Sequence, residues 1–159
     1  MEKMDLELTV TPFDRLTPEE LYEILRLRVN VFVVEQRCPY PELDGRDKTA
    51  LHVCLKNAEG IQAYLRIMDR DETHPYVTIG RVIAVPRRSG VGSRLLAEGI
   101  RLARERCQAR QIYLEAQTYA RSFYERQGFR QISPEFLEDG IPHIQMLLDF
   151  GQEPEAQSD

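Results

Sequence analysis

A glycine-rich loop in the middle of the chain has the residue types that bind a phosphate group. The segment GRVIAVPRRSGVGSRLL runs from Gly80 to Leu96: an apolar stretch, a loop with two glycines, and an amphipathic stretch. At the start of a helix, backbone N–H groups that no Cβ shields can surround an anion. We therefore predict that the loop holds a pyrophosphate, with contacts from Arg87, Arg88, Ser89, Gly90, Val91, Gly92 and Ser93.

The uneven charge of the chain supports an anionic ligand at this loop. The net charge is −5, yet the segment from Arg81 to Arg110 has eight arginines against two glutamates. A local positive field favours an anionic ligand. We assign Arg87 and Arg88, which adjoin the loop, to that ligand, and the arginines farther along to a solvated helix face. A nucleic-acid partner is not expected, because it requires a basic surface on the protein.

Two common phosphate-binding motifs fit this loop poorly. A Walker loop needs a lysine after its last glycine, and here Ser93 follows Gly92. A dinucleotide-binding fingerprint needs a third small residue, and here that position is Leu95. Glu115 lies at roughly the distance expected of the acid that binds ribose in such proteins. A dinucleotide-binding protein therefore stays open as a minor alternative.

The composition describes one globular domain without a metal site. The 159 residues are 42% hydrophobic and 30% charged, and the longest unbroken run of aliphatic and aromatic residues is Val31–Val34. A membrane span needs about 20 apolar residues, and the acidic start is unlike a secretory signal, so we expect a cytoplasmic protein without a membrane partner. The three cysteines are widely spaced and the three histidines lack helical pairing. We therefore expect reduced thiols and no metal ion.

The hydrophobic periodicity predicts elements in the order β, α, β, β, β, α, β, α, β. The segment Thr17-Pro18-Glu19-Glu20 forms a capping box that opens the first helix, which must end before Pro39. The expected strands span 6–10, 51–55, 61–68, 77–85, 112–116 and 143–150, and the later helices span 92–107 and 120–127. Such an order describes an α/β protein with a mixed sheet. Residues 151–159 are expected to form an acidic, disordered tail.

Two motifs in this frame resemble those of the GNAT N-acetyltransferases. The loop RRSGVG matches the family pattern [R/Q]-x-x-G-x-[G/A]. Downstream, Gln117-x-x-Ala120-x-x-Phe123-Tyr124-x-x-x-Gly128-Phe129 is similar to the family's N-x-x-A-x-x-F-Y-x-x-x-G-F helix, with Gln117 where asparagine is commonest. The resemblance covers residues 6–150. It implies a single GNAT-like domain over residues 1–150, with a central mixed, largely antiparallel sheet flanked by helices, and acetyl-CoA as co-substrate. It is compatible with a homodimer.

The resemblance also implies roles on the donor side of the reaction. In this family a backbone N–H of the strand before the loop holds the thioester carbonyl oxygen, and by position that donor falls at Val85. Tyr124 stands where the family's general acid protonates the departing thiolate. Gln117 stands where a side chain bonds the pantetheine arm of the cofactor. A free amine with a pKa near ~10 is mostly protonated at neutral pH, so a carboxylate or a water chain must take its proton.

Two further segments look like those of the ElaA-like branch of this family. They are RVNVFVVEQRCPYPELDG, which starts at Arg28, and EDGIPHI, which starts at Glu138. In the family, the corresponding segments wall the acceptor site. Glu35 and His143 are therefore candidate catalytic residues that attract a cationic amine and relay its proton. For Asp44 in the same region we favour a structural role in an Asp-Gly turn.

The sequence therefore predicts an N-acetyltransferase that moves an acetyl group from acetyl-CoA to a primary amine of a small molecule or peptide. A non-catalytic acyl-CoA-binding module is the main alternative. Such a module would keep the glycine loop but could dispense with Tyr124, so the presence of this tyrosine favours an enzyme. The acyl-chain length and the acceptor are not determined by the sequence.

Overall fold

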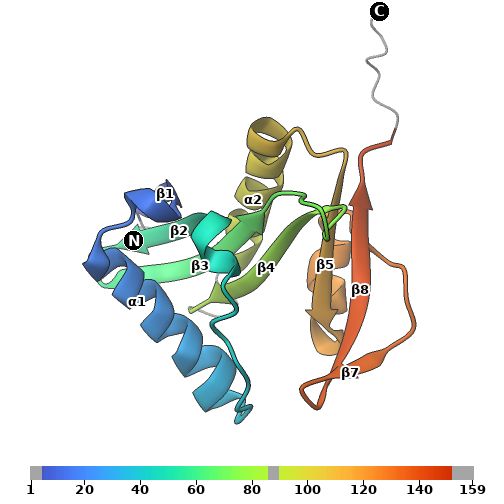
Figure 1. Cartoon of the computed structure of the whole chain (residues 1–159), viewed down its shortest axis with the longest axis horizontal. Helices are drawn as coiled ribbons and strands as arrows, with labels where there is room; N and C mark the ends of the chain where they lie inside the picture. Colours follow the sequence, from blue (N-terminus) through green and yellow to red (C-terminus); the bar gives the residue numbers. More distant parts are fainter. Residues whose placement is uncertain (1–4, 86–89, 152–159) are drawn as a thin grey trace, which may run out of the picture.

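The computed structural model describes residues 5–85 and 90–151, and in these residues the strands form one eight-stranded sheet (Figure 1). The strands follow each other across the sheet in the order β1-β2-β3-β4-β5-β8-β6, and β7 pairs with β8. Of the neighbouring strands, only β4 and β5 are parallel. The strands are β1 (Glu7–Pro12), β2 (Leu51–Asn57), β3 (Gly60–Met68), β4 (Val77–Ala84), β5 (Gln111–Gln117), β6 (Arg130–Gln131), β7 (Phe136–Glu138) and β8 (Ile141–Asp149).

The helices begin and end at residues that favour these positions. The helices are α1 (Pro18–Arg28), α2 (Val91–Cys107) and α3 (Arg121–Glu125), with short helical segments η1 (Phe13–Arg15), η2 (Val29–Glu35), η3 (Arg46–Thr49) and η4 (Thr118–Ala120). The predicted capping box is formed: the Glu20 N–H donates to Thr17 Oγ1 (3.1 Å), and the Thr17 N–H donates to Glu20 Oε1 (2.9 Å). Helix α1 continues directly into the π-helical η2, which ends before Pro39 as expected.

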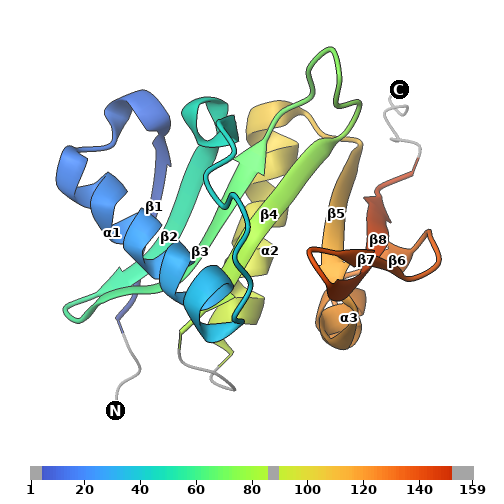
Figure 2. The same cartoon turned by 60° about the horizontal axis from the view of Figure 1, so that its bottom comes forward.

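The two long helices cover opposite faces of the sheet (Figure 2). Helix α2 packs Leu95, Leu96 and Leu102 into the main core, together with alternate residues of the strands beneath it, such as Leu65 of β3. Helix α1 lies on the other face, where Ile24 meets Cys54 and Tyr64. Because side chains alternate along β3, the sheet separates an apolar face under α2 from a face that also carries buried polar groups.

Strands β4 and β5 pair over only two positions and then separate, as Figure 1 shows. The pairs are Val77 with Ile112 and Thr78 with Tyr113. Beyond them, the register of β3 against β4 shifts, and Arg81 adopts a left-handed φ of 54°. An irregularity of this kind bends a strand and increases its twist. The bend turns the second half of β4 away from β5 and opens the sheet between them.

The predicted fold class, a mixed and largely antiparallel sheet flanked by helices, is confirmed. The short strands β6 and β7 and the 3-10 segments were not predicted, because two or three residues give no readable periodicity. Most of the predicted tail lies outside the described residues. Among the described residues, no helix is long and apolar enough to cross a membrane, and no group of His, Cys, Asp and Glu side chains is arranged to hold a metal ion. The three cysteines are free thiols in buried positions.

Candidate active site

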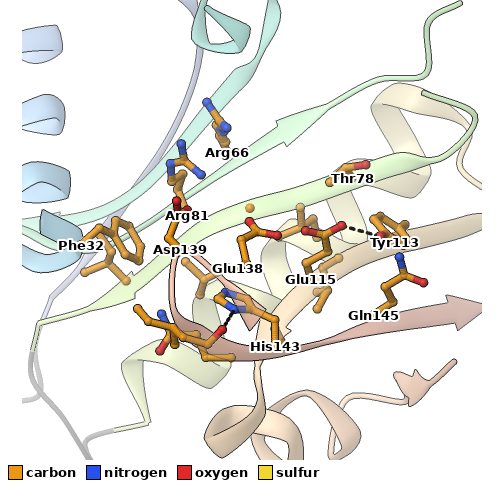
Figure 3. A pocket seen from close by; sticks show the side chains of 18 of the residues that line it. Phe32, Arg66, Thr78, Arg81, Tyr113, Glu115, Glu138, Asp139, His143 and Gln145 are labelled. Carbon is orange, nitrogen blue, oxygen red and sulfur yellow. Dashed lines mark hydrogen bonds between the residues drawn. The ribbon is translucent and has the colours of Figure 1, made fainter. Parts of the chain in front are cut away.

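A cleft of about 1070 Å³ occupies the opening between β4 and β5 (Figure 3). Its walls come from η2 and the loop after it, from β4 and β5, and from the β7–β8 hairpin. The lining combines charged and aromatic side chains from segments far apart in the sequence. The strand separation therefore gathers into one cavity the residues available for chemistry in this part of the fold.

The N-terminus of α2 follows β4 through the glycine loop. Gly90 is the N-cap with a φ of 82°, which favours glycine, and the first helical bond runs from the Arg94 N–H to the Gly90 carbonyl oxygen (3.1 Å). The first N–H groups of a helix have no partner within the helix and point out of its end, where they favour an anion. Ser93 is exposed there, whereas Val91 and Gly92 are buried. The predicted contacts Arg87, Arg88 and Ser89 lie outside the described residues.

Gly92 allows close packing at the first turn of α2. A Cβ at this position would lie 3.2 Å from the Cβ of Ala84 and 3.5 Å from the ring of Phe123. The absent side chain allows the first turn of α2 to approach the end of β4 and helix α3.

We expect Gly92→Ala to raise the KM for the acyl-CoA donor that the resemblance implies by about tenfold, equivalent to ~1.4 kcal/mol. The added methyl group must push the end of α2 away from β4 and so displace its N–H groups. Gly99→Ala is the matched control, because Gly99 lies in the middle of the same helix and its added Cβ would lie 2.8 Å from Cδ2 of Leu65. Steady-state kinetics and thermal unfolding of both variants test this. Equal KM values in the two variants would contradict a specific role for the helix end.

The structure does not support the backbone donor predicted at Val85. The Val85 N–H donates to the Gln62 carbonyl oxygen (2.8 Å), so it is engaged with β3. In an antiparallel ladder, successive residues direct their N–H groups alternately toward the partner strand and away from it. Ala84, opposite Ala63 in the ladder, therefore directs its N–H toward the opening beside β5 and lines the cleft.

Tyr124 lies at the same end of the cleft, on the short helix α3. Its ring is buried and packs edge-on against Phe123 and Phe129, with ring centroids 5.0 and 6.0 Å apart. Burial raises the pKa of the Tyr124 hydroxyl well above its usual range. The hydroxyl therefore stays protonated at neutral pH and can act as a donor.

The other predicted site residues line the same cleft. Gln117, at the end of β5, donates from Nε2 to Gln36 Oε1 (3.1 Å). This bond connects the β5 wall of the cleft to the wall formed by the end of η2. Glu35 is exposed at the end of η2. His143 lies opposite Gln117 on β8, donates from Nδ1 to the Ile141 carbonyl oxygen (2.7 Å), and stacks on Phe136. In neutral His143 this bond leaves Nε2 as the acceptor nitrogen.

Asp44 is held by ion pairs, in agreement with its predicted structural role. Its carboxylate accepts hydrogen bonds from Arg66 Nη2 (2.6 Å) and from the Arg46 N–H (3.0 Å). Burial alone would raise the pKa of Asp44, but the hydrogen bonds and charge of Arg66 hold it well below its ordinary value. A carboxylate paired in this way is a weak candidate for binding an additional cation.

Sequence reasoning missed a row of polar side chains on β5 and β8. Tyr113, Glu115 and Gln117 alternate with buried Leu114 and Ala116, so all three point to the cleft face of β5. Gln145 of β8 lies directly opposite Glu115. The alternation in YLEAQ was the available signal, but Glu115 was considered only as a ribose-binding acid. Glu138 from β7 completes the acidic side of the cleft (Figure 3).

A mixed sheet that opens between its two parallel strands, with the N-terminus of a helix following the first of them, is the architecture of an acyl-CoA-dependent acyltransferase. The chain belongs to the GNAT acetyltransferase family, since the family's acetyltransferase (GNAT) domain model matches residues 17–150.

Within this family the chain is similar to the protein ElaA and to UPF0039 proteins. A UPF0039 protein of Schizosaccharomyces pombe, C11D3.02c, is 40% identical over 150 residues, which cover 92% of this chain and 99% of that protein. The crystal structure of Escherichia coli ElaA has a TM-score of 0.86 at 34% identity and covers 91% of this chain and 100% of that one. A crystal structure described as an acyl-CoA N-acyltransferase from Pseudomonas aeruginosa has a TM-score of 0.84 at 37% identity, covering 91% and 99%.

Proposed function

We propose that this protein is an acetyl-CoA-dependent N-acetyltransferase that acetylates a primary amine by direct attack. The observation that carries the proposal is that Ala84, Tyr124 and several acidic side chains line one cleft. The P. aeruginosa structure, described as an acyl-CoA N-acyltransferase, supports an acyl-CoA donor. We further propose a cytoplasmic location, which suits three buried free thiols.

On the donor side, the protein holds the pyrophosphate and the thioester of acetyl-CoA at two separate places. The start of α2 binds the pyrophosphate, and the Ala84 N–H donates to the thioester carbonyl oxygen. A fixed backbone donor of this kind is worth a few kcal/mol to the transition state, because the oxygen gains negative charge as the amine attacks. The new C–N bond forms as the C–S bond breaks, and Tyr124 supplies a proton to the departing thiolate.

The proposal is tested by measuring the release of free thiol from acetyl-CoA in the presence of a library of primary amines. We expect release to depend on one class of amine and to follow Michaelis–Menten kinetics in both substrates. Mass spectrometry of the acceptor should show the added acetyl group. Binding of acetyl-CoA without release for every amine would favour the alternative, a non-catalytic acyl-CoA-binding module.

A further inference from the structure

Glu115 lies where β4 leaves an open space in front of it. The last paired positions of the two parallel strands are Thr78 and Tyr113, and two residues farther along stand Gly80 on β4 and Glu115 on β5. Gly80 has no side chain to fill the opening, and both residues line the cleft. The Tyr113 hydroxyl donates to Glu115 Oε2 (2.7 Å) and fixes the orientation of this carboxyl group. Glu115 therefore faces a cavity with room for a ligand.

Glu138 extends from β7 toward Glu115, and Figure 3 shows both carboxyl groups in the cleft. Burial raises the pKa of Glu138, and its hydrogen bond with Glu115 and the charge of Glu115 raise it further. A negative charge on one carboxyl group opposes ionisation of a neighbouring one. Glu138 can therefore take up a proton in a pH range where an isolated glutamate would remain ionised.

The charges around the pair favour a cation. Asp139 adds a carboxylate beside Glu138, and His143 is the nearby basic group of the hairpin. On the opposite wall, Arg66 and Arg81 are each paired with carboxylates. Arg66 donates to Asp44 and Asp47, and Arg81 Nε donates to Glu42 Oε2 (2.7 Å). The stacked rings of Tyr76 and Tyr113, 5.7 Å apart, border the same space and can contact a cation.

We propose that Glu115 and Glu138 together bind the ammonium group of the acceptor and take its proton. This inference rests on the proposed transfer to an amine. One N–H bond of the ammonium ion breaks and its proton passes to a carboxylate oxygen of the pair, which leaves the nitrogen lone pair free to attack the thioester carbon. The second proton leaves the nitrogen as the amide forms and is balanced by protonation of the thiolate. The pair then returns its proton to solvent.

The proposal moves the base away from Glu35 and His143. Exposure does not separate the candidate carboxyl groups, because Glu35, Glu115 and Glu138 are all exposed. Glu115 and Glu138 lie next to each other in the cleft (Figure 3), whereas Glu35 lies at the end of η2. His143 donates from Nδ1 to a backbone carbonyl and lies beside Glu138, so it can receive a proton from the pair without contacting the amine first. If the pair takes the proton of the ammonium group, Glu115 and Glu138 should both affect this deprotonation step.

The first test is a titration of side-chain carboxyl groups by ¹³C NMR, with n-butylammonium as the probe. In the wild type, Glu138 should titrate above the ordinary value of about 4.3, and Glu115→Gln should lower its pKa because a neighbouring negative charge is lost. The bound ammonium ion should also lower the pKa of the pair. Independent titration of both carboxyls near 4.3, unaffected by the probe, would overturn the proposal without reference to activity.

The second test is the pH dependence of kcat/KM for an amine that supports thiol release. Glu115→Gln and Glu138→Gln should each lower kcat/KM by about 10²-fold, leave the KM for acetyl-CoA unchanged, and move the acidic limb of the profile. Glu105→Gln, at an exposed position on α2, is the matched control. A limb that moves only in Glu35→Gln or His143→Gln would overturn the proposal. Failure of the wild type to release thiol would instead contradict the proposed function, while the titration still decides the role of the pair.

Discussion

Replacing Arg28 by methionine is expected to lower the free energy of unfolding by about 3–5 kcal/mol. The Arg28 side chain is completely buried at the end of α1 and pairs with two carboxylates, Glu42 in the loop after η2 and Asp47 in η3. Its Nε donates to Glu42 Oε2 (2.8 Å) and its Nη1 to Asp47 Oδ1 (2.6 Å). Methionine fills much of the volume but leaves buried negative charge with fewer partners, and such a charge is expensive.

The same change should loosen one wall of the cleft. Glu42 and Asp47 are also bonded to Arg81 and Arg66, so Arg28 connects the loop to both β3 and β4. The Tyr64 hydroxyl and His52 Nδ1, 2.7 Å apart, continue the network across the sheet. We therefore expect Arg28→Met to raise the KM for the acceptor even where the variant remains folded.

Chemical denaturation at several pH values measures this effect, with Arg26→Met as the matched control. Arg26 lies on the same helix, its side chain is 61% exposed, and its replacement should change the free energy of unfolding by no more than about 0.5 kcal/mol.

Burial alone would raise the pKa of Asp47, but the hydrogen bonds and charges of Arg28 and Arg66 lower it. That stabilisation is present above the unfolded pKa of about 3.9 and is lost as the pH falls through the folded value. The difference between wild type and Arg28→Met should therefore shrink in acid, and equal losses at Arg26 and Arg28 would contradict the role of the network.

The elements around the proposed donor side could be predicted from the sequence, because their determinants are local. The residues of the glycine loop before α2 are close together in the sequence, and so are the residues of the aromatic motif that contains α3. The spacing within each motif therefore predicts where α2 and α3 begin. The donor predicted at Val85 did not fit the structure, because the direction of an N–H depends on hydrogen bonding with β3. Sequence position alone does not fix that alternation.

The proposed acceptor side could not be predicted in the same way, because its residues meet only through the tertiary fold. Glu115 and Glu138 belong to different strands, and β7 is too short to show a periodic pattern. Arg81 gave no sign of its left-handed backbone, since arginine does not prefer that region. Yet the irregularity there accompanies the separation of β4 from β5 that creates the cleft. Buried ion pairs such as that of Arg28 with Glu42 are equally invisible until the loop is folded.

Replacing Tyr124 by phenylalanine is expected to lower kcat by about 10²-fold while the KM for acetyl-CoA changes little. General acid catalysis contributes roughly 10²–10⁴-fold, and a thiolate is a good leaving group, so we expect the lower end of that range. The phenylalanine ring can keep the edge-on contacts with Phe123 and Phe129. A large loss of stability is therefore not expected, and the defect should lie in the chemical step.

The dependence of this defect on pH separates proton donation from packing. If the Tyr124 hydroxyl protonates the thiolate, its absence matters less as the pH rises past the pKa of the released thiol, because the thiolate is then a stable product. The ratio of wild-type to Tyr124→Phe kcat should fall accordingly, whereas a packing defect would give a constant ratio. Tyr119→Phe is the control, since Tyr119 also borders the cleft but is 81% exposed. Similar losses of kcat in both variants would remove Tyr124 from the chemistry.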